Sequence, residues 1–480
     1  QEYMGKFPVI SVSLKGIDAG NYETARAMAV KTVNEEASRM QYLLESEKLT
    51  PYDKELFAGL LDRNMDDATL FGSLRELSRL LHMHYGKKTV ILIDEYDVPL
   101  AKAFAQGYYD QMILLIRSLF HQALKTNENL QMAVLTGCMR ISKESIFIGL
   151  NNLRVLSIAD VRFDEYFGFT DWEVKELLEY YGFSDYYAEV KEWYDGYQFG
   201  GVEVYCPWDV INYCDAIRAD KTAKPQNYWS NTSSNDAVRR FIQSADTGST
   251  KREIERLIAG ETICKEIHQE LTYQDMYSSV DNLWSVLFTT GYLTQRGKPE
   301  GRSFSLAIPN MEIREIFTEQ IMAFFKEDVR RNKGMAERFG TALEKGEAAE
   351  AERCFSEFLK RTISIRDTFV KRRLKENFYH GILLGILSCY DAWVVSSNRE
   401  AGEGYSDILL AMSDEETGVV IEVKYAENGN LEESCKKALL QIEANHYEEA
   451  LRKEGMEHIL KYGIACYKKR CRVMLAKPEK

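Results

Sequence analysis

The chain has 480 residues, of which 45% are apolar, and a formal net charge of −13 at pH 7. This length exceeds what one hydrophobic core serves, so we expect a globular protein of two to four domains. The acidic balance argues against a protein that coats nucleic acid, although it leaves room for a local basic groove. Nine dispersed cysteines without a CxxC pair favour reduced thiols over a zinc or disulfide framework.

No secretory leader or membrane-length apolar run is visible, so we expect a cytoplasmic protein that does not enter a membrane. The chain begins at Gln1 without a methionine, which favours a fragment or a trimmed chain as an expectation.

The first 165 residues alternate apolar strands with amphipathic helices. Apolar runs predict strands at 7–18, 89–99 and 130–137, and three-to-four spacing predicts helices at 22–48, 51–63, 68–84 and 107–125. Strand, helix, strand with strongly apolar strands is typical of a parallel sheet covered on both faces. We therefore predict an α/β domain over residues 1–165.

The pattern of predicted helices and strands changes over residues 166–345. "TDWE" at 170–173 has the capping-box pattern that opens a helix, and 194–210 predicts a hairpin followed by a helix from Pro207. A second hairpin is predicted at 291–310, between helices. This order suggests a helical lid or a winged-helix-like region, for which plain packing is favoured over DNA binding.

The remaining part, 346–480, begins with a helical lead-in. The charged helical stretch 312–362 has a glycine break near "EKGEAAEAER". After it we predict helix 374–389, strands 392–397, 405–412 and 418–425, helix 430–452 and strand 461–467. The C-terminal domain therefore has the order αβββαβ.

Two of these strands carry charges in an otherwise buried run. Asp407 begins one strand, and Glu422 and Lys424 lie two residues apart on the next, so they project to one face. If the two strands form a hairpin, Asp407 approaches Glu422. Two carboxylates can hold Mg²⁺ or Mn²⁺, and an adjacent lysine can position a water or steady transition-state charge. The alternative is a structural Glu–Lys pair beside a solvated turn acid.

At these residues the chain resembles the PD-(D/E)XK nuclease superfamily, whose restriction-endonuclease-like core has this element order. The resemblance implies that Asp407 and Glu422 are metal ligands and Lys424 is the catalytic lysine. It further suggests Gln441 on the following helix as a site residue and Glu376 as an outer acid.

Two basic stretches flank the proposed site in sequence. They are "KRTISIRDTFVKRRLK" at 360–375 and "KKRCR" at 468–472. A basic rim suits a phosphate backbone, and a solvated helix face is the commoner meaning of such a run. His380 and His446 near the predicted nuclease helices are interpreted as packing residues.

The strand at 89–99 ends in Asp94-Glu95, and it looks like the Walker B element of a P-loop NTPase. There the aspartate orients Mg²⁺ and the glutamate activates the attacking water. Thr136 matches the polar tip of the next strand, and Arg140 is a candidate contact to nucleotide or a neighbouring subunit. No string of the form G-x-x-x-x-G-K-[ST] is present, so the predicted NTPase core is partial.

Together, "ILIDEYDVPL", "LTGCMRISKESIFIGLNNL", "WYDGYQFG" and "IEVKYA" resemble bacterial AAA-ATPase-like proteins with a C-terminal PD-(D/E)XK nuclease domain. The resemblance implies a metal-dependent nuclease acting on nucleic acid, with DNA favoured, and ATP as a ligand of the full-length protein. ATP hydrolysis by the chain as given is not expected, and a homo-oligomer is an option. The alternative is a non-catalytic ATP-binding regulator or DNA-binding scaffold with remnant sites.

Overall fold

The computed structural model describes most of the chain. The described residues are 3–138, 146–147, 153–229, 236–244, 248–276, 278–331, 333–361, 372–387, 393–397, 407–412, 416–453 and 455–476. They fold into two compact units, residues 1–160 with 267–290 and residues 161–266 with 291–480. The three-part division at 165 and 345 stays a prediction. Among the described residues, no helix is both long and apolar enough to cross a membrane.

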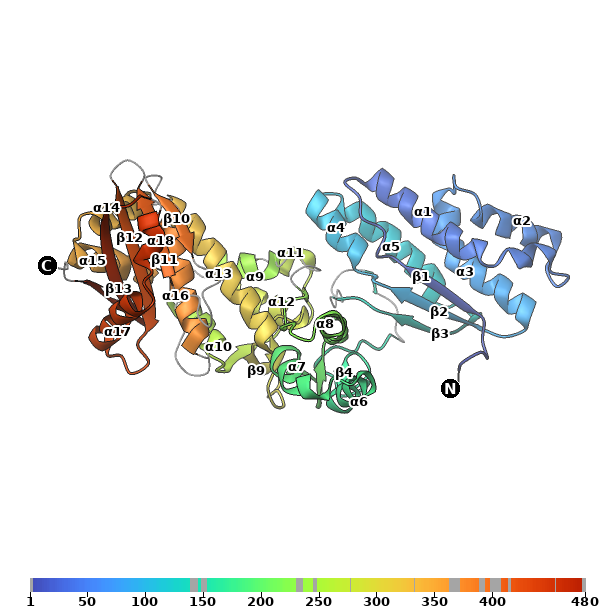
Figure 1. Cartoon of the computed structure of the whole chain (residues 1–480). Helices are drawn as coiled ribbons and strands as arrows, with labels where there is room; N and C mark the ends of the chain where they lie inside the picture. The colour runs from blue at the N-terminus through green and yellow to red at the C-terminus, as the bar shows by residue number, and fades with distance from the viewer. Residues whose placement is uncertain are drawn as a thin grey trace. The chain divides into compact units, whose positions relative to one another are not determined.

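The first unit is a three-stranded parallel sheet with helices packed on it (Figure 1). Its elements are β1 (Val9–Ser13), α1 (Tyr22–Ser38), a 3₁₀ turn (Gln41–Glu45), α2 (Pro51–Leu60), α3 (Asp67–Tyr85), β2 (Thr89–Asp94), α4 (Val98–Gln106), α5 (Tyr109–Leu124), β3 (Leu130–Leu135), α11 (Tyr273–Met276) and α12 (Val280–Thr289). The strand order is β1-β2-β3, and Ser13 pairs with Asp94 where β1 and β2 end. The predicted parallel sheet is therefore confirmed.

The sheet of the first unit was predicted to be covered on both faces, and one face differs from that prediction. Helices α1, α3 and α5 lie on one face (Figure 1). On the other face Val9, Leu92, Met132 and Val134 keep 37–43% of their surface exposed among the described residues. Parallel sheets are normally buried on both faces, so this face is an exception within the described structure.

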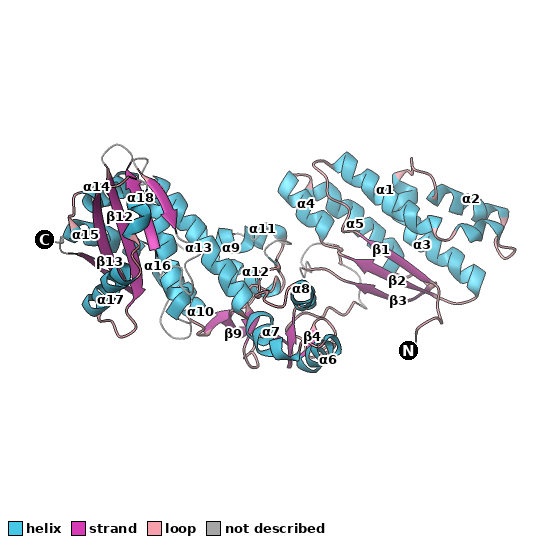
Figure 2. Cartoon of the chain, viewed as in Figure 1, coloured by secondary structure: helices cyan, strands magenta, loops and turns pink. Residues whose placement is uncertain are grey.

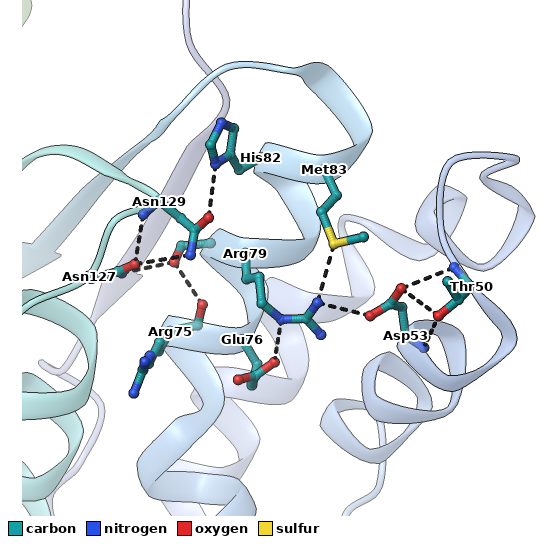
Figure 3. A network of polar contacts seen from close by, with 10 residues as sticks. Thr50, Asp53, Arg75, Glu76, Arg79, His82, Met83, Asn127 and Asn129 are labelled. Carbon is teal, nitrogen blue, oxygen red and sulfur yellow. Dashed lines mark hydrogen bonds and ion pairs between the residues drawn. The ribbon is translucent and has the colours of Figure 1, made fainter.

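A polar network ties the helices together near the N-terminal ends of the strands (Figure 3). Arg79 Nη1 donates to Asp53 Oδ1 over 2.9 Å, and Arg79 Nε donates to Glu76 Oε2 over 2.9 Å. His82 Nδ1 lies 2.8 Å from Asn129 Oδ1, just before β3. Because this network is at the opposite end of the strands from Asp94, we interpret it as structural.

The second unit begins with small sheets and helices. Its elements up to residue 361 are β4 (Phe169–Thr170), α6 (Asp171–Tyr181), a 3₁₀ turn (Ser184–Tyr186), α7 (Tyr187–Tyr194), β5 (Tyr197–Phe199), β6 (Val202–Tyr205), α8 (Pro207–Ala219), α9 (Asp236–Ser244), α10 (Gly248–Ile258), β7 (Ile263–Glu266), β8 (Thr294–Gln295), β9 (Ser303–Ala307), α13 (Met311–Arg331), α14 (Lys333–Glu344) and α15 (Ala348–Arg361). Both predicted hairpins form, and Thr170 and Glu173 make the predicted capping box. Each hairpin has a third strand, β4 and β7 respectively. The winged-helix likeness stays a prediction.

The C-terminal domain is a five-stranded sheet between helices (Figure 2). Its elements are α16 (Arg372–Leu387), β10 (Val394–Ser397), β11 (Asp407–Met412), β12 (Thr417–Tyr425), α17 (Leu431–Ala444), α18 (Glu448–Lys453), β13 (His458–Tyr467) and β14 (Arg470–Leu475). The strand order is β10-β11-β12-β13-β14, and only β12 and β13 run parallel.

Two details of this domain correct the prediction. The helix expected at 430–452 is two helices, because His446 between them has a left-handed backbone with φ of 53°. The basic run at 468–472 forms a tight turn and the start of β14, in which Cys471 and Val473 are buried.

Candidate active site

The site is built on the hairpin of β11 and β12. The backbone register pairs Asp407 directly with Glu422. The side chain of Asp407 lies outside the described part of the structure, so the convergence of the two carboxylates stays a prediction. The strand β12 is buried along nearly its whole length, as its run of β-branched residues indicates.

Glu422 is a carboxylate held entirely out of water. Its exposed fraction is 0%, and neither carboxylate oxygen accepts a well-directed hydrogen bond from any described group. Lys424 Nζ lies 2.7 Å from Glu422 Oε1, and its side chain is 12% exposed. Burying a carboxylate is costly unless its oxygens have hydrogen-bond or ionic partners. A single lysine leaves most of the acceptor capacity of the two oxygens unused. Glu422 therefore keeps carboxylate oxygens without a hydrogen bond among the described groups.

Helix α17 covers the sheet face on which Glu422 lies. Gly463 pairs with Glu422 across the parallel ladder of β12 and β13. A Cβ built on Gly463 would lie 2.5 Å from the carbonyl oxygen of Cys435, so the glycine lets α17 approach the sheet closely. Residues in register on neighbouring strands project to one face, so Glu422 and Lys424 face α17.

Gln441 lies on α17 and is half-buried. Its Nε2 donates to Tyr447 Oη over 3.4 Å. No hydrogen bond between Gln441 and Glu422 is present among the described contacts, and the role of Gln441 stays a prediction.

Helix α16 adds two titratable residues one turn apart. Glu376 Oε1 accepts a hydrogen bond of 3.2 Å from the backbone N–H of Tyr425, the last residue of β12. Burial lowers the pKa of His380, and the negative charge of Glu422 works against that shift. The charge of Glu422 thus acts on His380 across the domain core. His380 was interpreted from sequence as a packing residue, and the four-residue spacing from Glu376 was the signal that could have linked it to the site.

Of the two predicted metal ligands, Glu422 is the one whose side chain the structure describes, and its carboxylate is the ligand type of hard divalent cations. Buried carboxylate oxygens without hydrogen bonds are the ligands that such ions prefer. Among the residues whose side chains are described, no three His, Cys, Asp or Glu residues form a metal-binding group, and the side chain of Asp407 is outside that set.

The structure describes the basic stretch 468–472 more completely than the basic stretch 360–375. Residues 362–371 of the first flank lie outside the described residues. In the second flank Lys469 binds Glu255 at 2.9 Å, and Arg472 binds Glu352 at 3.3 Å. These two cations hold the β13–β14 hairpin to neighbouring elements, so they contribute less to a phosphate rim than the sequence suggested.

The second candidate site is the edge of the first unit where its parallel strands end. Thr136 Oγ1 donates a short hydrogen bond to Asp94 Oδ1, and the Leu14 N–H donates to the Asp94 carbonyl over 2.9 Å. Glu95 has a left-handed backbone with φ of 55°, a strained conformation that clusters at functional sites. Asp94 is exposed and Glu95 half-buried, and Arg140 lies outside the described residues.

Next to this edge, Asp97 is a buried acid, 3% exposed, that accepts a hydrogen bond of 3.2 Å from the Cys138 N–H. Cys138 itself is exposed, and the hydrogen bond from its backbone to Asp97 ties the end of β3 to the segment after β2. Asp97 is therefore a structural brace beside the edge.

Comparison with known proteins assigns both parts. A family model described as "Predicted AAA-ATPase" matches residues 1–147, and one described as "PD-(D/E)XK nuclease superfamily" matches residues 374–475. The chain thus joins an AAA-ATPase-like part to a PD-(D/E)XK nuclease superfamily domain, as the resemblance predicted.

Over 256 residues the chain is 25% identical to a protein of Azotobacter chroococcum mcd 1 that is described as "Uncharacterized protein in vnfD 5'region". The match covers 52% of this chain and 45% of that protein. No solved structure matches the chain significantly.

Proposed function

We propose that the C-terminal domain is a metal-dependent nuclease with Glu422 and Lys424 at its centre. The observation that carries this proposal is the fully buried Glu422 carboxylate, which has one lysine at 2.7 Å and oxygens left without hydrogen bonds. The match of residues 374–475 to the PD-(D/E)XK nuclease superfamily supports it.

In the proposed reaction Glu422 and Asp407 hold Mg²⁺ or Mn²⁺, a choice supported by their register across the hairpin. When bound, the cation supplies Lewis acidity toward a phosphodiester oxygen and a water. Lys424 orients the attacking water and stabilises the charge that develops on the phosphate. We assign supporting roles in this site to Glu376 and His380 on α16 and to Gln441 on α17.

We further propose that Asp94, Glu95, Thr136 and Arg140 belong to a nucleotide site that regulates this nuclease. The hydrogen bond from Thr136 to Asp94 and the match of residues 1–147 to an AAA-ATPase model support it. ATP binding also requires a phosphate-binding loop, and the printed sequence has no G-x-x-x-x-G-K-[ST] string.

The test is cleavage of supercoiled plasmid and of single-stranded oligonucleotides in Mg²⁺, Mn²⁺ or EDTA. We expect metal-dependent cleavage that Lys424→Ala lowers at least about 100-fold, because one preorganised charge is lost. Lys461→Ala is the matched control, since Lys461 forms a half-buried pair with Glu448 at 3.0 Å in the same domain. Equal loss in both variants, or cleavage that persists in EDTA, would count against the proposal.

A further inference from the structure

A small cavity opens beside Lys424. It has a volume of about 90 Å³ and lies between the end of β12, the turn that follows it and the first two turns of α17. Lys424 and Lys437 line it, together with the polar side chains of Asn428 and Ser434. A space of this size holds several water molecules and hence the oxygens of one phosphate group.

Helix geometry connects this cavity to the candidate active site. Ser434, Lys437 and Gln441 are spaced by three and four residues, so they form one stripe along α17. The packing of α17 against Gly463 sets the helix over the face that carries Glu422 and Lys424. A polynucleotide strand that follows this stripe would reach Lys437 about one turn from Gln441.

Lys437 can bind an anion in this cavity by exchanging its present partner, the carboxylate of Glu433, for that anion. Lys437 Nζ lies 2.7 Å from Glu433 Oε1, and both side chains are more than half exposed. Glu433 also accepts a hydrogen bond from Asn430 Nδ2, while Glu427 is the other acid of the lining. Exposed pairs of this kind contribute little to stability, so Lys437 can turn from Glu433 to a phosphate at low cost.

We propose that this cavity binds the phosphate next to the scissile one, with Lys437 as its cation, so that the substrate is a polynucleotide strand. The inference rests on the proposed nuclease function and adds a subsite to it. A small phosphodiester without a flanking phosphate would leave the subsite empty.

Adjacent residues of α17 provide a matched control. Lys436 pairs with Glu432 at 2.9 Å, just as Lys437 pairs with Glu433, and the lysines are 60% and 62% exposed. Only the second pair lines the cavity. Lys437→Gln and Lys436→Gln therefore remove the same charge and the same type of ion pair, and differ only in position.

The first measurement is binding of a labelled single-stranded oligonucleotide, by fluorescence anisotropy in Ca²⁺ over a range of salt. We expect Lys437→Gln to weaken binding about tenfold, the loss of one charge-assisted contact, and to lower the salt slope by about one ion. Lys436→Gln should do neither. Glu433→Gln should tighten binding, whereas Glu432→Gln should not.

The second measurement separates this inference from the proposed function. In Mg²⁺, Lys437→Gln should raise KM for the oligonucleotide and leave hydrolysis of bis(p-nitrophenyl) phosphate unchanged. Equal behaviour of Lys436→Gln and Lys437→Gln would overturn the subsite even if the chain cleaves. Position-dependent binding without any cleavage would overturn the nuclease and keep the subsite, and no binding by any form would overturn both.

Discussion

The two candidate sites place acids on strands of very different sheets. In the first unit, Asp94 ends a strand on a face with exposed apolar side chains, and the carboxylate itself is exposed. In the C-terminal domain, helices cover both faces, and Glu422 is fully buried. Asp94 is satisfied by Thr136, while the oxygens of Glu422 lack hydrogen bonds among the described residues.

This difference explains why Glu422 is a stronger candidate than Asp94 for an acid that needs a bound cation. An exposed acid with a hydrogen bond is stable as it stands and needs no ligand. A buried carboxylate with one lysine carries a desolvation cost that a cation would offset. The C-terminal site is therefore the stronger candidate within the described structure, and the following predictions test the contrast.

The largest expected effect is on stability. Lys424→Met leaves Glu422 buried without its partner, so we expect a loss of about 3–5 kcal/mol in the free energy of unfolding. The double variant Glu422→Leu/Lys424→Met should recover most of it, because no buried charge remains. Urea denaturation measures both. A loss below about 1 kcal/mol in the single variant would mean that water reaches Glu422.

A second buried acid in the same unit has a carboxyl partner instead of a lysine. Asp209 in the first turn of α8 and Glu312 in the first turn of α13 are both 0% exposed. Burial raises the pKa of both carboxyls, and the charge of Asp209 raises that of Glu312 further. Glu312 Oε1 accepts from the Trp229 N–H over 2.8 Å, and Glu312 Oε2 and both Asp209 oxygens lack described donors. Burial and the repulsion between the two carboxyls therefore favour the protonated form of the pair.

The sign of the pH dependence follows from that shift. Above the ordinary carboxyl pKa of 4.5, the folded state holds a proton that the unfolded state has released. Stability is highest below that value and falls as pH rises toward the raised folded-state pKa, by about 1–3 kcal/mol between pH 5 and 8. The neighbouring Cys206, Tyr197 and Tyr228 all have raised pKa values, so they stay neutral over this range.

Glu312→Gln keeps the shape of the side chain and removes one titrating group. We expect its urea midpoint to vary less between pH 5 and 8 than that of the unchanged protein. Parallel midpoint curves for the two proteins would show that the pair ionises freely and that its burial has little energetic consequence.

The smallest effect is expected at the exposed acid. Thr136→Val removes the hydrogen bond to Asp94, and Asp94→Asn removes its charge. Because the site is open to water, each change should alter the free energy of unfolding by less than about 1 kcal/mol. A loss as large as that of Lys424→Met would contradict the contrast between the two sites.

The sequence predicted the pairing of Asp407 with Glu422 across the hairpin largely because the pattern is local. Asp407, Glu422 and Lys424 lie on adjacent strands joined by a short connection, so the register follows from the hairpin. The continuous run of β-branched residues in β12 predicted that the strand is buried along nearly its whole length.

The features that the sequence did not predict depend on long-range strand pairing or on single residues. β7 pairs with β9 about 40 positions later, which no local period reveals. The start of β14 was interpreted by its charge, although Cys471 and Val473 alternate with arginines as in a half-buried strand. The influence of Glu422 on the pKa of His380 comes from a strand that lies far away in sequence, so no local pattern predicts it.

The most direct test of the central claim is metal binding at Glu422, measured by electron paramagnetic resonance of Mn²⁺ titrated into the protein. Glu422→Gln is compared with Glu448→Gln, which alters another acid of the same domain paired with a lysine. We predict that the unchanged protein and Glu448→Gln bind alike, while Glu422→Gln binds one Mn²⁺ fewer or at least about tenfold more weakly. Identical Mn²⁺ binding by all three proteins would contradict the assignment of Glu422 as a metal ligand.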